Sequence, residues 1–91
     1  MGVYRDRIAD KLTRALAPRA LVITDDSARH HGHAGAQADG EGETHFNVEV
    51  ESEAFAGKSR LERQRIVYDL LADELKERVH ALSLQLTAPG Q

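Results

Sequence analysis

The 91-residue chain contains no cysteine. This absence excludes a disulfide framework and a zinc finger, and it leaves imidazole as the only soft ligand that the chain offers to a metal ion. No stretch approaches the roughly 20 apolar residues that a membrane-spanning helix needs. Residues 1–6 also lack the apolar run of a signal peptide. We therefore expect a protein without a membrane segment, located in the cytoplasm.

The length and charge of the chain indicate one small domain. A chain of this size builds a single modest hydrophobic core, so residues 1–91 are expected to fold as one unit. The 12 basic and 15 acidic side chains give a formal net charge of -3. This balance argues mildly against nucleic acid as the main partner.

Histidine is the residue type that carries the strongest hint of chemistry. Of the five histidines, His30, His31 and His33 fall within four residues in a glycine-containing stretch, and His80 stands alone. The run by itself is a candidate for binding Zn²⁺, Ni²⁺ or Cu²⁺. Its spacing is not that of a helical His-x-x-x-His site, and a loop is a poorly preorganised cage. Adventitious metal binding is therefore the expected property of this run on its own.

Hydrophobic periodicity predicts six elements. Pro18 ends the first helix, and the capping box Ser59-x-x-Glu62 opens the longest one. Polar, glycine-rich residues 26–43 are expected to form a long flexible loop, and residues 88–91 a disordered tail. In chain order the predicted elements are a helix over 3–17, strands over 21–24 and 44–51, a short helical piece over 52–55, a helix over 60–78 and a strand over 80–87.

The apolar positions predict which faces point to the core. In the first helix they fall on one stripe, in the long helix they follow a 3.6-residue period, and in the second and third strands they alternate. The predicted core residues are Ile8, Leu12, Ala15, Leu16, Phe46, Val48, Val50, Leu61, Val67, Leu71, Leu75, Val79, Leu82, Leu84 and Leu86.

This order of elements predicts a three-stranded mixed sheet with helices on one face. The helical connection between the second and third strands favours a parallel, right-handed crossover, whereas the first two strands most simply pair antiparallel. In that arrangement the end of the first strand and the starts of the other two share one edge of the sheet. His30, His45 and His80 lie at these three points, so we expect them to converge.

The second half of the chain resembles the BolA family. The matching residues are Phe55-x-Gly57-Lys58-Ser59-x-Leu61-x-Arg63-Gln64-Arg65-x-Val67-Tyr68 and Val79-His80-Ala81-Leu82, preceded by Ser27-x-x-His30 and Glu43-Thr44-His45-Phe46. The resemblance covers about residues 4–87 and implies a class II KH-like α/β fold, with the order α-β-β-α-α-β. Two departures are Gln64, where the family usually has histidine, and the short or missing C-terminal helix.

The resemblance also implies a partner and a cofactor. Members of the family pair with a monothiol glutaredoxin that carries a Cys-Gly-Phe-Ser active site, and the two proteins share a [2Fe-2S] cluster with bound glutathione. The ligand positions match His80, at the head of the last strand, and His30, with His33 the main alternative and His31 behind it. We accordingly expect a monomer that forms a heterodimer with the glutaredoxin.

Each of these histidines has a simpler interpretation. His80 shares strand parity with the leucines that follow it, so it is also a candidate core residue, and a loop histidine is also a candidate solvated side chain. His45 has the opposite parity. We interpret it as a group that orients a ligand or stabilises the fold, in preference to a metal ligand itself.

Nucleic-acid binding is the second functional hypothesis. The Gly32-His33-Ala34-Gly35 stretch matches the Gly-x-x-Gly loop of KH domains, but it is predicted between two strands instead of two helices, so the match is spurious. A basic cluster at the start of the long helix is a candidate for binding phosphate, the partner protein or the carboxylates of glutathione, or for a solvated face. The family is also associated with transcriptional regulation. The cluster consists of Lys58, Arg60, Arg63 and Arg65.

The sequence does not predict an enzyme. It has no cysteine nucleophile, no nucleophile elbow and no Walker motif. Asp26, Ser27 and His30 are too close in sequence for a convincing catalytic triad, and the first two more plausibly stabilise the turn after the first strand.

Overall fold

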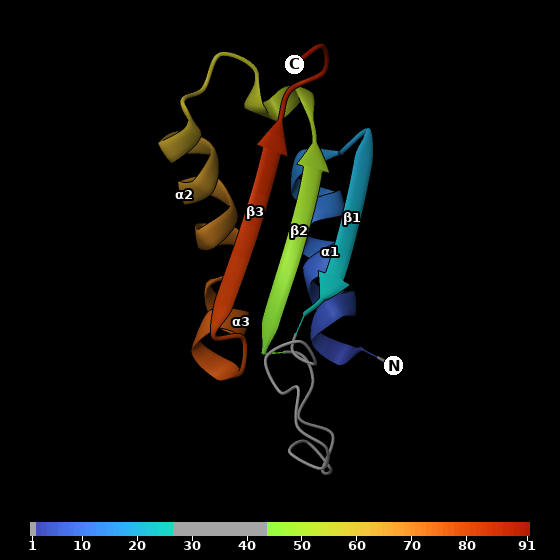
Figure 1. Cartoon of the computed structure of the whole chain (residues 1–91), viewed down its shortest axis with the longest axis vertical. Coiled ribbons are helices and arrows are strands. Elements are labelled where there is room, and N and C mark those ends of the chain that lie inside the picture. The colour runs from blue at the N-terminus through green and yellow to red at the C-terminus, as the bar shows by residue number, and fades with distance from the viewer. Residues whose placement is uncertain (1, 27–43) are drawn as a thin grey trace.

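The computed structural model describes residues 2–26 and 44–91. The predicted loop, apart from Asp26, therefore lies outside the described residues, together with His30, His31 and His33. The elements follow the predicted order, with the predicted helical region after residue 59 divided in two (Figure 1). They are α1 (Val3–Leu16), β1 (Ala20–Asp25), β2 (His45–Glu51), the 3₁₀ helix η2 (Glu53–Phe55), α2 (Arg60–Leu70), α3 (Ala72–Glu77) and β3 (Ala81–Thr87).

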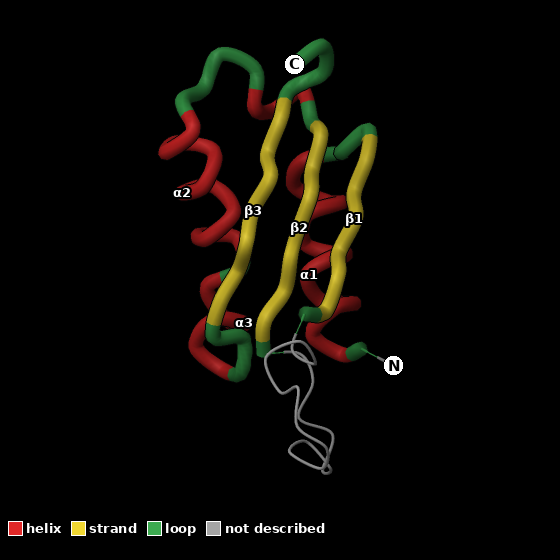
Figure 2. Tube along the Cα trace, viewed as in Figure 1, coloured by secondary structure: helices red, strands yellow, loops and turns green. Residues whose placement is uncertain are grey.

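The three strands form the predicted mixed sheet, in the order β1-β2-β3. β1 pairs antiparallel with β2, with Ile23 opposite Val48, and β2 pairs parallel with β3, with Val48 opposite Leu84. Figures 1 and 2 show the helices on one face of this sheet, while no described helix or strand covers the opposite face. The predicted fold class, a mixed α/β domain with a three-stranded sheet, is confirmed.

The hydrophobic core lies between the helices and the inner face of the sheet. The alternation of β2 decides this placement, because Phe46, Val48 and Val50 are buried and the residues between them are not. The buried apolar residues are Ile8, Leu12, Leu16, Ile23, Phe46, Val48, Val50, Phe55, Val67, Leu71, Val79 and Ala88. Leu82, Leu84 and Leu86 are partly buried against them, as expected for an inward-facing edge strand.

Two predicted core positions are wrong. Leu61 is 56% exposed on the first turn of α2, and Ala15 is exposed near the end of α1. Leu61 fits the 3.6-residue period, but the helix begins at the outer end of the fold, where none of the other described elements covers this side chain. A period identifies a stripe on a helix without showing how far the core extends along it.

The predicted helix over 60–78 is interrupted at Leu71, which has φ -104° and ψ 20°. Hydrogen bonds continue across the bend, from Leu71 N to Val67 O and from Leu75 N to Leu71 O, both at 3.0 Å. The local sequence contains no glycine or proline to signal the bend. Tertiary packing accompanies it instead, because Leu71 and Glu74 are both completely buried.

The last four residues form a turn instead of the expected disordered tail. Ala88 is buried, and Gln91 N donates to Ala88 O at 3.1 Å. The Gln91 side-chain oxygen accepts hydrogen bonds from Ala88 N at 2.9 Å and from Arg63 Nη1 at 2.8 Å. Polar contacts from α2 therefore fix a segment whose composition suggested fraying.

Within the described ranges, no helix has the length and apolar character needed to cross a membrane.

Candidate functional site

The predicted meeting of strand ends at one sheet edge is present in the described residues. Asp26, directly after β1, donates from its backbone N to His45 O at 2.7 Å. Thr44 O, directly before β2, accepts from His80 N at 2.7 Å and from Ala81 N at 3.2 Å. The end of β1 and the starts of β2 and β3 are therefore tied together by backbone hydrogen bonds. We call this region the histidine edge, defined by Asp26, Thr44, His45 and His80.

Two imidazoles lie next to each other at the histidine edge. The ring centroids of His45 and His80 are 6.4 Å apart, and the ring planes are tilted by 53°. His80 is exposed, whereas His45 is half-buried, with its Nδ1 2.9 Å from Thr44 Oγ1. The interpretation of His80 as a core residue is therefore wrong, because it precedes the paired strand and emerges at its end.

A shallow hollow adjoins this edge on the open face of the sheet. It has a volume of about 170 Å³ and is lined by Asp26, His45, Phe46, Ala81, Leu82 and Ser83. Among the described residues, no group of three or more histidine, aspartate or glutamate side chains is arranged to hold a metal ion. The two visible histidines thus do not by themselves complete a metal centre.

An ion cluster around one buried carboxylate, which the sequence analysis did not predict, supports the segment that leads to His80. The Glu74 side chain is 0% exposed and accepts hydrogen bonds from Arg7 Nε at 2.8 Å and from Lys11 Nζ at 2.9 Å. Arg7 also contacts Glu77, with Nη1 to Oε1 at 2.8 Å, and Tyr4 donates its hydroxyl to Glu77 at 3.0 Å. The cluster joins α1 to α3.

The charge state of Glu74 follows from these contacts. Burial acts to raise the pKa of the carboxyl, but hydrogen bonds from Lys11 and a backbone amide, together with the charges of Lys11 and Arg7, outweigh it. The pKa of Glu74 is therefore lowered, and the group is ionised at neutral pH. Its backbone carbonyl accepts from Arg78 N and Val79 N at 3.1 and 2.9 Å, so Glu74 also fixes the turn directly before His80.

One sequence signal for this cluster was available. Glu74 lies seven residues after Val67 and three after Leu71, which places a carboxylate on the apolar stripe of the long helical region. A charge on such a stripe needs a buried partner. The partners Arg7 and Lys11 come from the other end of the chain, however, and the pattern of α1 shows Lys11 only as a residue that faces away from the core.

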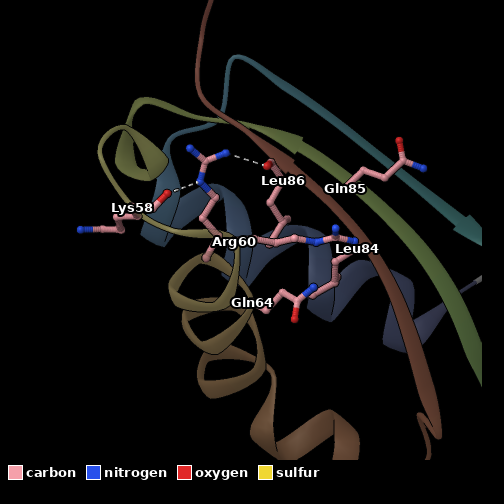
Figure 3. A pocket seen from close by; sticks show the side chains of 7 residues that line it. Lys58, Arg60, Gln64, Leu84, Gln85 and Leu86 are labelled. Carbon is pink, nitrogen blue, oxygen red and sulfur yellow. Dashed lines mark hydrogen bonds between the residues drawn. The ribbon is translucent and has the colours of Figure 1, made fainter. Parts of the chain in front are cut away.

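The basic cluster lies at a second site, far along the sheet from the histidine edge. The start of α2 and the outer side of β3 enclose a groove of about 390 Å³, which we call the β3 groove (Figure 3). Arg65, the fourth predicted cation, is exposed but does not line it. The lining residues are Lys58, Arg60, Arg63, Gln64, Leu84, Gln85 and Leu86.

Arg63 is held by other groups of the chain. Its Nε donates to Lys58 O at 3.0 Å, and its Nη1 donates to Leu86 O at 3.0 Å and to Gln91 Oε1 at 2.8 Å. Figure 3 draws the bonds to the two backbone oxygens as dashed lines. This guanidinium joins α2 to β3 and to the last residue, which reduces its availability for a phosphate or a partner.

The capping box predicted at the start of α2 is confirmed. Ser59 Oγ accepts from Glu62 N at 3.1 Å, and Glu62 Oε1 accepts from Ser59 N at 2.7 Å. The hydrogen bond from the Ser59 backbone is the main reason why the pKa of Glu62 is lowered. Two helix N-terminal donors are consequently already paired, and a carboxylate occupies the place that an external anion would take.

The fold and the two sites define an α/β domain with a helix-covered, three-stranded mixed sheet and a histidine at the head of its last strand. A family model described as "BolA-like protein" matches residues 12–91. The chain belongs to the BolA-like family.

Curated relatives and solved structures agree with this assignment. The chain is 47% identical to the SufE-like protein 1, chloroplastic/mitochondrial, of Arabidopsis thaliana over 100% of its own length and 25% of that protein. It is 44% identical to Protein BOLA1, chloroplastic, of the same plant, covering 93% of this chain and 53% of that protein. The chain therefore spans between a quarter and about half the length of these relatives.

A bacterial relative and one solved domain extend the comparison. The DNA-binding transcriptional regulator BolA of Escherichia coli (strain K12) is 42% identical, with 90% of this chain and 72% of that protein covered. The solved BolA domain of SufE1 from Arabidopsis thaliana superimposes with a TM-score of 0.84 and 45% identity, covering 98% of this chain and 95% of that chain.

Proposed function

We propose that this BolA-like domain is the partner of a monothiol glutaredoxin with a Cys-Gly-Phe-Ser active site, and that the two proteins hold a [2Fe-2S] cluster between them. In this role the domain is an adaptor in iron–sulfur cluster maturation, trafficking or iron regulation, and not an enzyme. The observation that carries the proposal is the exposed imidazole of His80 at the histidine edge. The cytoplasmic location expected from the sequence stays a prediction.

The donor set of the chain fits a shared cluster. Imidazole replaces thiolate as a ligand in some [2Fe-2S] centres, where it raises the reduction potential. His80 has an exposed ring near Asp26 and Thr44, which both form hydrogen bonds within the histidine edge. These two residues flank residues 27–43, the part of the sequence that contains His30, His31 and His33. His30, or alternatively His33, would supply the second imidazole, and both lie outside the described residues. The glutaredoxin cysteine and glutathione would supply the thiolates that this chain lacks.

The test is reconstitution of the cluster with the glutaredoxin, glutathione, iron and sulfide, followed by visible absorption and EPR spectroscopy. His80→Ala is expected to change both spectra and to reduce cluster retention. His45→Ala is the matched control, because it removes the neighbouring imidazole without removing the proposed ligand. Spectra that are unchanged by His80→Ala would show that this histidine is not a ligand.

The second imidazole is identified by the same assay with single substitutions in the loop. His30→Ala, His31→Ala and His33→Ala are compared, and the one that alters the EPR signal identifies the ligand. Light scattering of the separate and mixed proteins tests the assembly, with a monomer expected alone and a heterodimer expected in the mixture.

DNA binding is a second candidate function, favoured by the description of the E. coli relative as a DNA-binding transcriptional regulator. Lys58, Arg60 and Arg65 are exposed near the start of α2 and are the cations available for phosphate. This function predicts an affinity that falls steeply with salt and with Arg60→Ala. A flat salt response in a filter-binding or anisotropy assay would exclude it.

A further inference from the structure

The outer edge of β3 carries backbone groups that no strand of the described ranges pairs. β3 is the last strand of the sheet, because the strand order is β1-β2-β3. On the β2 side, Ala81 N bonds to Thr44 O, and Thr87 O accepts from Ser52 N at 2.9 Å. Alternate residues of a strand direct their backbone groups to opposite sides. The N–H and C=O groups of Leu82, Leu84 and Leu86 therefore point away from β2.

One of these backbone groups confirms that they point away from β2, and it limits how much of β3 is available for pairing with another strand. Leu86 O accepts a hydrogen bond from Arg63 Nη1 at 3.0 Å, from the α2 side of the strand. Arg63 is itself fixed by Lys58 O and Gln91. The guanidinium thus already occupies the Leu86 carbonyl at one end of the β3 groove. The backbone N–H and C=O of Leu84 remain as the accessible pair within the groove.

The charge of the groove has the opposite sign to that of the whole chain. Three cations and no carboxylate line it, although the formal net charge is -3. Neither Lys58 nor Arg60 forms an ion pair with another described residue. Figure 3 shows Arg60 extending toward Leu84, while the Lys58 side chain points outward. Arg60 is therefore the cation best placed to meet a negatively charged group beside β3.

The lining favours a peptide over a nucleic acid. Single-stranded nucleic acids are usually held by aromatic rings on which their bases stack, and the lining contains no aromatic residue. The Ser59–Glu62 capping box already occupies two N-terminal donors of α2 that would otherwise face a phosphate. A free strand edge, in contrast, offers the alternating donors and acceptors that an extended peptide matches.

We propose that the β3 groove binds an extended acidic peptide segment of a partner protein, which adds a short fourth strand beside Leu84 and directs its carboxylates toward Arg60. This site is separate from the histidine edge and does not depend on the proposed cluster.

The probe is a peptide of about eight residues with alternating valine and glutamate, a length typical of a strand. Titration into the ¹⁵N-labelled protein is expected to shift the amide signals of Leu84 and Leu86 and to slow hydrogen exchange at Leu84. Arg60→Ala is expected to weaken binding about two- to five-fold, as for an exposed ion pair, and Lys58→Ala less. Both effects are expected to diminish with added salt.

Matched controls separate this site from general charge effects and from the histidine edge. Lys76→Ala removes an exposed lysine of α3 and is expected to leave the affinity unchanged, as is His80→Ala. A peptide with lysine in place of glutamate is expected not to bind. The absence of shifts at Leu84 and Leu86, or equal binding of the lysine peptide, would overturn the proposal. Tighter binding of a single-stranded oligonucleotide at the same residues, with displacement of the peptide, would assign the groove to nucleic acid instead.

Discussion

The imidazoles of His45 and His80 lie at the heads of two adjacent parallel strands, with their ring centroids 6.4 Å apart. The chain brings them together through the backbone, because Thr44 O accepts from His80 N while Thr44 Oγ1 contacts His45 Nδ1. The two rings differ in their surroundings, since His80 is exposed and His45 is half-buried. This difference separates a ring that is accessible to a partner from a ring that supports the edge.

The contrast predicts different effects of the two alanine substitutions on the fold. His80→Ala is expected to leave the thermal unfolding temperature unchanged, because an exposed ring contributes little packing. His45→Ala is expected to lower it, since the substitution removes the contact with Thr44. Circular dichroism on the metal-free protein measures both. A large loss of stability in His80→Ala would mean that this side chain supports the fold, and its effect on the cluster would then need a ligand-independent explanation.

The fold was predictable because the relevant information is local. Alternation in residues 44–51, the capping box at Ser59 and the helical crossover between the last two strands are sufficient to give the element types, the parallel pairing and the shared edge of His45 and His80. None of these depends on a contact between distant side chains. The position of His80 at the head of its strand likewise follows from where the alternating pattern begins.

The features that were not predictable depend on distant partners. Glu74 is separated from Arg7 by most of the chain, so the apolar stripe that runs from α2 into α3 signals a buried carboxylate without identifying what neutralises it. Arg63 belongs to a basic sequence cluster, yet the backbone oxygens of Lys58 and Leu86 hold it in place. The bend at Leu71 has no signal in the local sequence, because strong helix formers surround it.

The buried carboxylate predicts a large effect of Glu74→Gln. The substitution removes the charge that pairs with Arg7 and Lys11, which keep their contacts with Glu77 and Asp73. It is expected to lower the free energy of unfolding by about 2 kcal/mol. Urea denaturation followed by circular dichroism measures the change. Asp10→Asn is the matched control, because Asp10 pairs with Arg14 on the exposed side of α1, the helix that carries Arg7 and Lys11, and it is expected to have almost no effect. Equal effects of the two substitutions would contradict the importance of burial.

The lowered pKa of Glu74 predicts a loss of stability in acid. The folded state holds this carboxyl ionised to a lower pH than the unfolded chain does, so the unfolded chain binds a proton first as the pH falls. The stabilisation is complete above the ordinary pKa of 4.5 and is lost progressively below it. Glu77, whose pKa is lowered mainly by a hydrogen bond from Arg7, adds to the same trend. Urea midpoints measured between about pH 3 and 7 test this, and Glu74→Gln is expected to flatten the curve.

The three hydrogen bonds of Arg63 predict a structural role that lysine cannot replace. Arg63→Lys keeps the positive charge but loses the planar group that reaches Lys58 O, Leu86 O and Gln91 together. We expect both Arg63→Lys and Arg63→Ala to reduce the free energy of unfolding by about 1 kcal/mol and to speed hydrogen exchange at the amides of Ala88 and Gln91. Arg65→Ala, a change at an exposed arginine of the same helix, is the control and is expected to leave that exchange unchanged. If Arg63→Lys kept slow exchange at Gln91, charge alone would account for the ordered C-terminal turn.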